Sequence, residues 1–102
     1  MIVWAEKLYV SSNIEKKKER LMRRIRTNRL TFDLHCIICA ENEKNLLEII
    51  PAKELKHPHY QRSSLFVVGL AKGKDEAKEL VRVIIEDVFT STGDFDVRTY
   101  FK

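Results

Sequence analysis

The hydrophobic positions along the chain change period several times, and each change predicts a new element of secondary structure. Residues 2–10 carry apolar side chains at every second position, interrupted by Glu6, which predicts a strand that is solvent-exposed at its middle. Beyond it, apolar residues recur every three or four positions, and Ser12 and Glu15 have the spacing of a capping box. A helix is therefore expected over about 13–27.

The middle of the chain predicts two strands separated by a segment of ambiguous type. Segment 45–52 suits either a short strand or one helical turn, and 53–64 is expected to be an exposed connection. The continuous apolar run 65–71 is typical of a central strand covered on both faces. Before these, residues 30–40 alternate, and one face of that expected strand comprises Leu30, Phe32, Leu34, Cys36 and Ile38.

The C-terminal third predicts a second helix and a closing strand. From Ala77 to Val88 apolar residues recur at helical spacing, with Asp75 in the first turn and Gly93 as a natural C-terminal stop. Residues 94–101 alternate again, so a last strand is expected there.

The expected order is strand, helix, strand, ambiguous segment, strand, helix, strand. Two βαβ units joined by a connection predict an α+β fold, a ferredoxin-like βαβ-βαβ sandwich with two helices on one face of a mainly antiparallel sheet. A small open α/β sheet is the alternative, although its parallel order would need helices on both faces. The length of 102 residues fits a single domain over 1–102.

Composition narrows the class of protein and its compartment. With 44% hydrophobic residues, three Gly and two Pro, the chain is suited to a packed core rather than to disorder. Two cysteines are too few for a disulfide framework, and the N-terminal residues lack the apolar run of a signal peptide. No run approaches the roughly 18 apolar residues of a membrane span. A cytoplasmic location with reduced thiols and no membrane segment is expected.

Three short motifs invite a chemical interpretation, and in each the spacing favours a structural role. Cys36 and Cys39 form a CxxC inside an expected strand, where odd spacing sends the two side chains to opposite faces. His57 and His59 are a weak chelate without an accompanying ligand pattern. The glycines of 69–75 lack the spacing of a phosphate loop. Neither a metal nor a cofactor is expected.

The segment between Glu15 and Arg29 concentrates positive charge. It holds eight basic residues and two acidic ones, a local charge of +6 in a chain whose formal net charge is +4, so the remainder carries −2. An exposed face of this kind can bind a phosphate backbone, or it can pair with acids of a neighbouring helix such as Glu79, Glu86 or Asp87. Five cations share the face and are the candidate nucleic-acid or anion-binding residues: Lys16, Lys17, Arg20, Arg23 and Arg24.

These patterns support two hypotheses about the function. The leading hypothesis is a non-enzymatic regulatory or protein-interaction module that forms a homodimer through its sheet. It depends on Ile37 and Cys39, which would give a partly apolar sheet face beside Thr31, Asp33 and His35. The alternative is a nucleic-acid-binding module that uses the basic helix face. No spacing ties a nucleophile to a base, so an enzyme is not expected.

Overall fold

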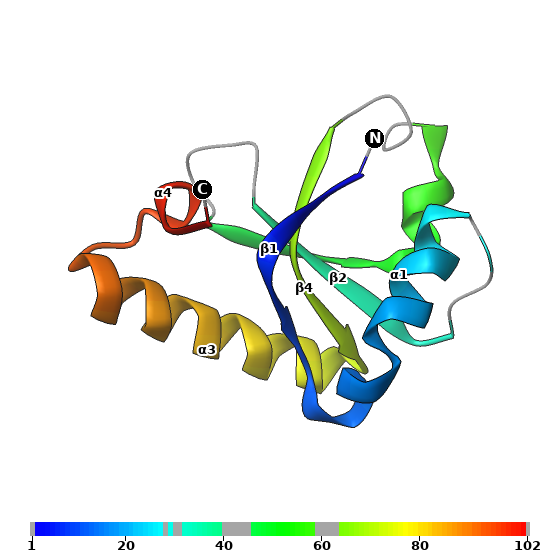
Figure 1. Ribbon diagram of the computed structural model, residues 1–102, viewed down its shortest axis with the longest axis horizontal. Coiled ribbons are helices and arrows are strands. Elements are labelled where there is room, and N and C mark those ends of the chain that lie inside the picture. Colours follow the sequence, from blue (N-terminus) through cyan, green and yellow to red (C-terminus); the bar gives the residue numbers. More distant parts are fainter. Residues whose placement is uncertain (1, 28, 30–31, 40–45, 59–63, 102) are drawn as a thin grey trace.

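The computed structural model has a four-stranded mixed sheet at its centre (Figure 1). The structure describes residues 2–27, 29, 32–39, 46–58 and 64–101. The strands are β1 (Ile2–Val10), β2 (Leu34–Cys39), β3 (Leu47–Pro51) and β4 (Leu65–Lys72). Their order in the sheet is β1-β4-β2-β3. β1 runs parallel to β4, whereas β2 is antiparallel to both of its neighbours, β4 and β3.

The helices are α1 (Lys18–Arg26), α3 (Lys74–Thr92) and α4 (Val97–Phe101), together with the 3-10 helices η1 (Ser12–Lys17) and η2 (Ala52–Lys56). α3 confirms the expected second helix: it begins after Gly73 and ends at Gly93, whose φ of 78° is left-handed. Of the helices in the described part of the chain, none is both long enough and apolar enough to cross a membrane.

The helix expected over 13–27 is present as η1 followed by α1, and its start differs from the prediction. The capping box does not form, because the N-cap of η1 is Ser11 and no side-chain capping hydrogen bond is made there. Instead the Ser11 hydroxyl donates to Asn13 Oδ1 at 2.6 Å and accepts from the backbone N–H of Lys72 at 3.3 Å. The first turn therefore contacts the sheet rather than capping itself.

β4 is the central strand that the apolar run predicted. Val67, Val68, Leu70 and Ala71 are all fully buried, so both faces of the strand are covered. At Gly69 a Cβ atom would lie 3.1 Å from the side chain of Ile37 and 3.3 Å from that of Leu80 on α3. The missing side chain lets α3 pack close against the sheet.

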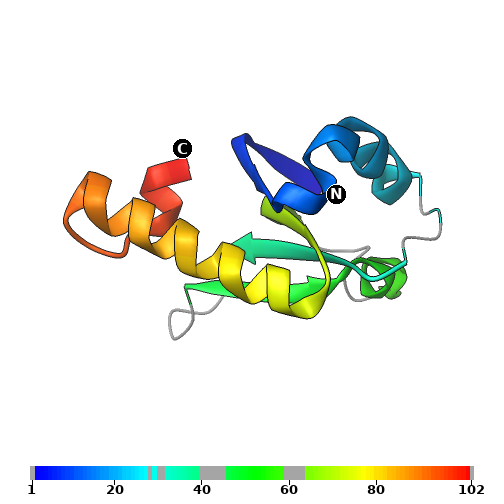
Figure 2. The ribbon, with the colours of Figure 1, turned by 90° about the horizontal axis from the view of Figure 1, so that it is seen from below.

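Two separate cores lie on the two faces of the sheet, and each is covered by a different helix (Figures 1 and 2). Ile14 of η1 and Ile25 of α1 pack with Cys36 on one face. Leu80 and Ile84 of α3 pack with neighbouring Ile37 on the other. The prediction of two helices on one face is thus not confirmed, nor is the ferredoxin-like strand order. The physical reason is that β2 and β4 are apolar on both faces, so both need covering.

The strand expected over 94–101 is wrong, because this segment forms α4. The Asp96 carboxylate accepts hydrogen bonds from the Thr99 backbone N–H at 3.2 Å and from the Thr99 hydroxyl at 2.6 Å. This is the N-capping arrangement that starts a helix. Val97 is buried against the α3-side core, which holds α4 in place.

The strands of the middle region also differ from the prediction in their bounds. The ambiguous segment 45–52 contains β3, which is followed by η2. Within 53–64, Lys53, Glu54, His57 and Pro58 are exposed as expected, whereas Leu55 of η2 is buried in the α1-side core. β2 begins at Leu34, later than expected, and positions 30–31 lie outside the described residues.

Candidate nucleic-acid interface

A hollow of about 160 Å³ opens beside η1 and α1 at the end of β4. Its floor is apolar and includes Ile14 and Leu34, both 3% exposed. Among the described residues, no Asp or Glu side chain lines it. Its polar lining includes four cations from three segments of the chain, and these are Lys17, Arg20, Arg24 and Lys72. A concave surface with one sign of charge concentrates the potential felt by an anion.

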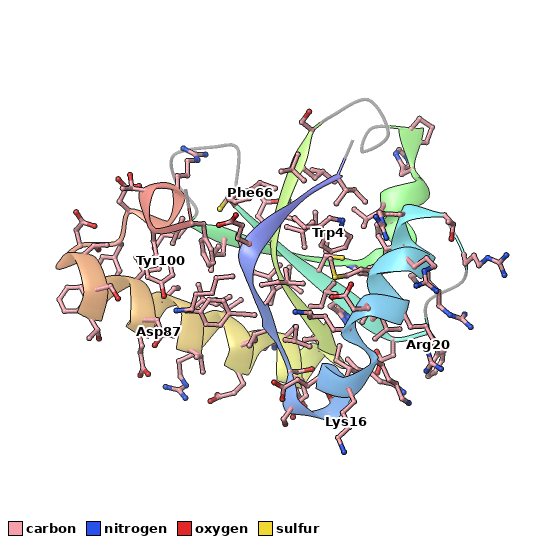
Figure 3. All side chains as sticks on the ribbon, viewed as in Figure 1. Trp4, Lys16, Arg20, Phe66, Asp87 and Tyr100 are labelled. Carbon is pink, nitrogen blue, oxygen red and sulfur yellow. The ribbon has the colours of Figure 1, made fainter. Side chains whose placement is uncertain are left out.

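The five cations predicted from the sequence are all exposed on η1 and α1, as expected. The structure brings Lys17, Arg20 and Arg24 together in the hollow. Lys16 and Arg23 lie outside its lining, and Figure 3 shows Lys16 close to the start of the helix. The predicted patch is therefore real as an exposed surface, but only part of it forms the concave site.

The start of η1 is fastened to the last residues of β4, which places the cations of the two elements on one surface. Ser11 is 4% exposed and its backbone N–H donates to the Leu70 carbonyl at 3.0 Å. The Asn13 side-chain amide donates to the Lys72 carbonyl at 3.2 Å. Because Ser11 Oγ also accepts from the Lys72 N–H, these bonds hold Lys17 and Lys72 beside the same hollow.

Phe32 is the residue of the site that sequence reasoning misplaced. It was expected on the inward face of a strand, yet it is 86% exposed and lines the hollow. The neighbouring Asp33 has a φ of 55°, which interrupts the strand alternation before Leu34 turns into the core. The Asp33 carbonyl accepts from the Gly73 N–H at 2.9 Å, so the turn is fixed to the beginning of α3. Asp at position 33 was the available signal, because Asp adopts positive φ more readily than most residues.

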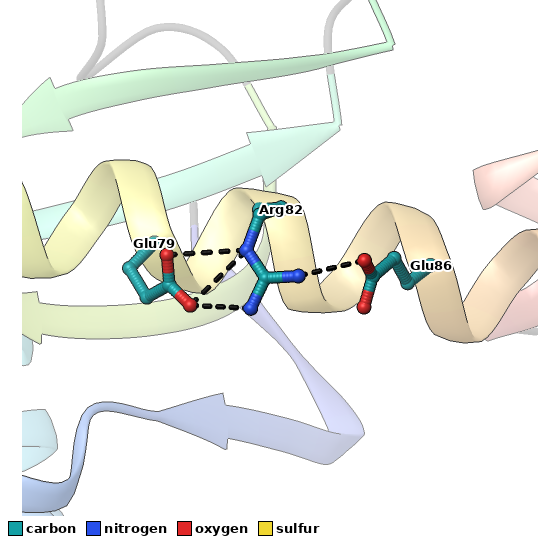
Figure 4. Close-up of polar contacts among 3 residues, drawn as sticks. All are labelled: Glu79, Arg82 and Glu86. Atoms are coloured by element: carbon teal, nitrogen blue, oxygen red, sulfur yellow. Dashed lines mark hydrogen bonds and ion pairs between the residues drawn. The ribbon is translucent and has the colours of Figure 1, made fainter.

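The acids proposed as internal partners of the basic face are engaged elsewhere. Arg82 lies between Glu79 and Glu86 on α3, with nitrogen–oxygen distances of 2.5 Å and 2.6 Å (Figure 4). Asp87 accepts a hydrogen bond from the Tyr9 hydroxyl at 2.7 Å. In the part of the chain that the structure describes, no ion pair joins an acid to Lys17 or Arg20. Lys17 and Arg20 thus keep their charges available for an external anion.

A second polar cluster connects β1 with α3 and α4. Lys7 donates to the Tyr100 hydroxyl at 3.0 Å, and the hydroxyls of Tyr100 and Tyr9 are 2.9 Å apart. Because the Tyr9 proton is donated to Asp87, Tyr100 must donate to Tyr9. The hydrogen bond from Lys7 lowers the pKa of Tyr100, whereas burial raises that of Tyr9. This chain of hydrogen bonds connects three elements, and its two charged groups, Lys7 and Asp87, both bond to tyrosine hydroxyls within it.

The two cysteines are structural. Cys36 belongs to the α1-side core and Cys39 to the α3-side core, which confirms that the CxxC sends its side chains to opposite faces. Both thiols are free and buried, and burial raises the pKa of Cys36 to about 12. A protonated, enclosed thiol is a poor nucleophile and a poor metal ligand. Among the described residues no cluster of three His, Cys, Asp or Glu could hold a metal, and His59 lies outside them.

The residues that suggested an open sheet face are covered within the chain. Ile37 is fully buried and Cys39 is 9% exposed, and both belong to the core beneath α3. The apolar face expected to bind a second copy is therefore occupied by the protein's own helix.

Comparison with known proteins adds no functional assignment. No protein-family model, curated protein or solved structure matches the chain. The residues of the hollow offer exposed cations for phosphate oxygens, buried apolar side chains and one exposed aromatic ring.

Proposed function

We propose that this protein is a nucleic-acid-binding module whose phosphate-binding surface is the exposed basic face of η1 and α1. The observation that carries the proposal is the hollow, where Lys17, Arg20, Arg24 and Lys72 converge and no described acid intervenes. Cations that neutralise phosphates release condensed counterions, which drives binding without regard to base sequence. The local charge of +6 against −2 elsewhere orients the molecule toward a polyanion with this surface first.

The salt dependence follows from the number of phosphate contacts. For about four contacts with a single strand, the affinity falls about 50-fold between roughly 50 mM and 200 mM salt. With two contacts removed, the same change of salt lowers the affinity only about sevenfold. The slope therefore counts the cations that touch phosphate, independently of any change in the affinity at one salt concentration.

The test is a double charge reversal, Lys17→Glu with Arg20→Glu, which removes two of the cations that line the hollow, measured by fluorescence anisotropy with a labelled thymidine strand of about 12 nucleotides. The matched control is Lys53→Glu with Lys78→Glu, which changes the net charge equally at exposed positions outside the hollow. Urea unfolding followed through the single tryptophan, Trp4, verifies that both variants remain folded.

The expected result is a large loss of affinity and a shallower salt slope for the first variant only. Equal losses in both variants would show that net charge alone attracts the strand, and the assignment to η1 and α1 would be wrong. Absence of binding by the unmodified protein at low salt would refute the proposal as a whole.

Self-association through the sheet is the second candidate function, and one observation favours it. β1 is an edge strand of nine residues that pairs with β4 on one side, and Val3 on it is 44% exposed. An edge strand of this length can pair with a second copy. Light scattering over micromolar concentrations tests it, and a monomer mass throughout would exclude the homodimer.

A further inference from the structure

We infer that the nucleic acid bound at this interface is single-stranded, with a base stacked on Phe32 while the neighbouring cations hold the phosphates. This inference rests on the proposed function and specifies its ligand. A second feature carries it: the exposure of an aromatic ring at the edge of a cationic hollow, which phosphate binding alone does not require.

Phe32 is followed by Asp33, whose positive φ of 55° separates its direction from that of the buried Leu34. Leu34, two residues later, is 3% exposed, and the intervening Asp33 bonds to Gly73 through its carbonyl. The chain on either side of Asp33 thus turns in opposite directions, with Leu34 in the core and Phe32 outside it.

An exposed aromatic ring distinguishes single strands from duplexes. In a duplex the faces of the bases are stacked on one another, and a protein reaches only phosphates and groove edges. In a single strand the bases can splay out, and each stacks on an aromatic side chain with little preference for sequence. Stacking on Phe32 therefore requires a single strand, in which the faces of the bases are accessible.

The dimensions and chemistry of the hollow agree with this ligand. Its volume is about 160 Å³, and Lys17, Arg20 and Lys72 in its lining suit the phosphate oxygens of a strand. The apolar floor of Ile14 and Leu34 lies under the exposed cations. A base is thus expected outside the hollow on Phe32, with its backbone along Lys17 and Lys72.

The molecule carries a matched control for exposed aromatic surface. Phe89 and Phe95 are 50% and 49% exposed and stack on each other with ring centroids 5.1 Å apart. They lie at the far end of α3, away from the hollow, and the described residues beside them include the acidic Glu86 and Asp94. Phe95→Ala therefore removes an exposed ring without touching the proposed interface.

The experiment compares Phe32→Ala, Phe32→Trp and Phe95→Ala with four labelled probes of about 12 units. The probes are a deoxyuridine strand, a uridine strand, an abasic strand with the same phosphates, and a duplex. Phe32→Ala is expected to weaken binding of the deoxyuridine and uridine strands about 5- to 150-fold, the effect of losing one stacked base. The abasic strand and the duplex should bind the variant as they bind the unmodified protein. Phe32→Trp should retain the affinity, and Phe95→Ala should have no effect.

The two base-bearing strands identify the source of the ligand. Tighter binding of the uridine strand indicates RNA and tighter binding of the deoxyuridine strand indicates DNA, because the two strands differ only in the 2′-hydroxyl. Either result supports the inference, provided that Phe32→Ala weakens the preferred strand.

Other outcomes separate the two proposals. Stacking is excluded, while the basic interface stands, if Phe32→Ala lowers the affinity for the abasic strand and the duplex as much as for the base-bearing strands. The same conclusion follows if it lowers the affinity for no probe. Tighter binding of the duplex than of either strand would also overturn single-strand recognition. If no probe binds, or if the Lys17 and Arg20 reversal changes nothing, the proposed function itself fails.

Discussion

The two sides of the sheet use charge in opposite ways. On the α3 side, Arg82 is flanked by Glu79 and Glu86, and Asp87 ends a chain of hydroxyl groups that begins at Lys7. On the η1–α1 side, cations converge on a hollow that no described acid lines. Figure 3 shows the contrast, with Asp87 and Tyr100 on one side of the sheet and Lys16 and Arg20 on the other. Charge on the first side is satisfied within the fold, and charge on the second faces outward.

The outward-facing charge has a cost that the rest of the fold must offset. Arg20 lies three and four residues from Lys17, Lys16, Arg23 and Arg24, so like charges repel along the same face of a short helix. Each such pair destabilises a helix by a few tenths of a kcal/mol. The helix is held instead by the buried side chains beneath it and by its hydrogen bonds to β4.

The largest expected effect comes from removing buried volume under α3. Ile84→Ala should lower the free energy of unfolding by about 3–5 kcal/mol, because Ile84 is fully buried in the middle of the 19-residue helix. Ile25→Ala, in the last turn of the nine-residue α1, should cost about 2 kcal/mol. Urea unfolding followed by Trp4 fluorescence measures both. A greater loss at Ile25 would mean that the α1 side dominates the stability.

The next effect concerns pH and the α1-side core. Burial raises the pKa of Cys36 to about 12, so between about pH 8.5 and 12 the folded chain keeps a proton that the unfolded chain releases. Stability is therefore full below about pH 8.5 and falls as the pH rises, by up to about 1.4 kcal/mol per pH unit.

The control for this pH dependence is Cys36→Ala, whose packing loss is the same at each pH and cancels in the comparison. Urea unfolding at about pH 8 and pH 10 should show a steeper loss for the unmodified protein than for the variant. Equal slopes would mean that the thiol does not hold its proton in the folded state. Tyr9, whose pKa burial also raises, contributes equally to both proteins.

A smaller effect is expected from the hydroxyl chain on the α3 side. Tyr9→Phe removes the oxygen that links Asp87 to Tyr100 and should lower the free energy of unfolding by about 1 kcal/mol. Binding to the thymidine strand should not change, because this cluster lies outside the hollow. Denaturation and anisotropy on the same sample separate the two effects. A parallel loss of affinity would show that the two sides of the sheet are coupled.

The smallest effect gives the most direct test, because Arg→Gln on the two sides of the sheet should change the stability in opposite directions. Arg20→Gln should stabilise the fold by a few tenths of a kcal/mol by relieving repulsion, while weakening strand binding. Arg82→Gln should slightly lower the urea midpoint, since its ion pairs are solvent-exposed, and leave binding unchanged. If Arg20→Gln instead destabilises the chain, the basic face has an internal role and the contrast between the sides disappears.

The sequence was sufficient to predict the type and the buried face of an element where burial extends over the whole element. The apolar run 65–71 correctly predicted β4 as a central strand, and the spacing from Ala77 to Val88 correctly predicted the buried face of α3. The spacing of Cys36 and Cys39 also predicted their separation onto two faces. In these cases a single periodicity, repeated over several residues, decides the outcome.

Short segments were ambiguous because local hydrogen bonds compete with periodicity. The alternation over 94–101 resembles a strand, but the bonds from the Asp96 carboxylate to Thr99 begin a helix instead. The alternation over 30–40 predicted a strand that begins too early, because the positive φ of Asp33 turns Phe32 outward before β2 begins at Leu34. One residue in a special conformation overrides a pattern that spans its neighbours.

By itself, therefore, the amino-acid sequence determined the central strand, the amphipathic long helix and an exposed basic face at Lys16, Lys17, Arg20, Arg23 and Arg24. Only the tertiary structure decided that the helices cover opposite faces of the sheet, and that Phe32 and Lys72 join three of those cations around one hollow. The physical reason is distance along the chain. Periodicity reports which side of its own element a residue occupies, whereas a concave site depends on strand order and on bonds between remote segments, such as Asn13 to Lys72.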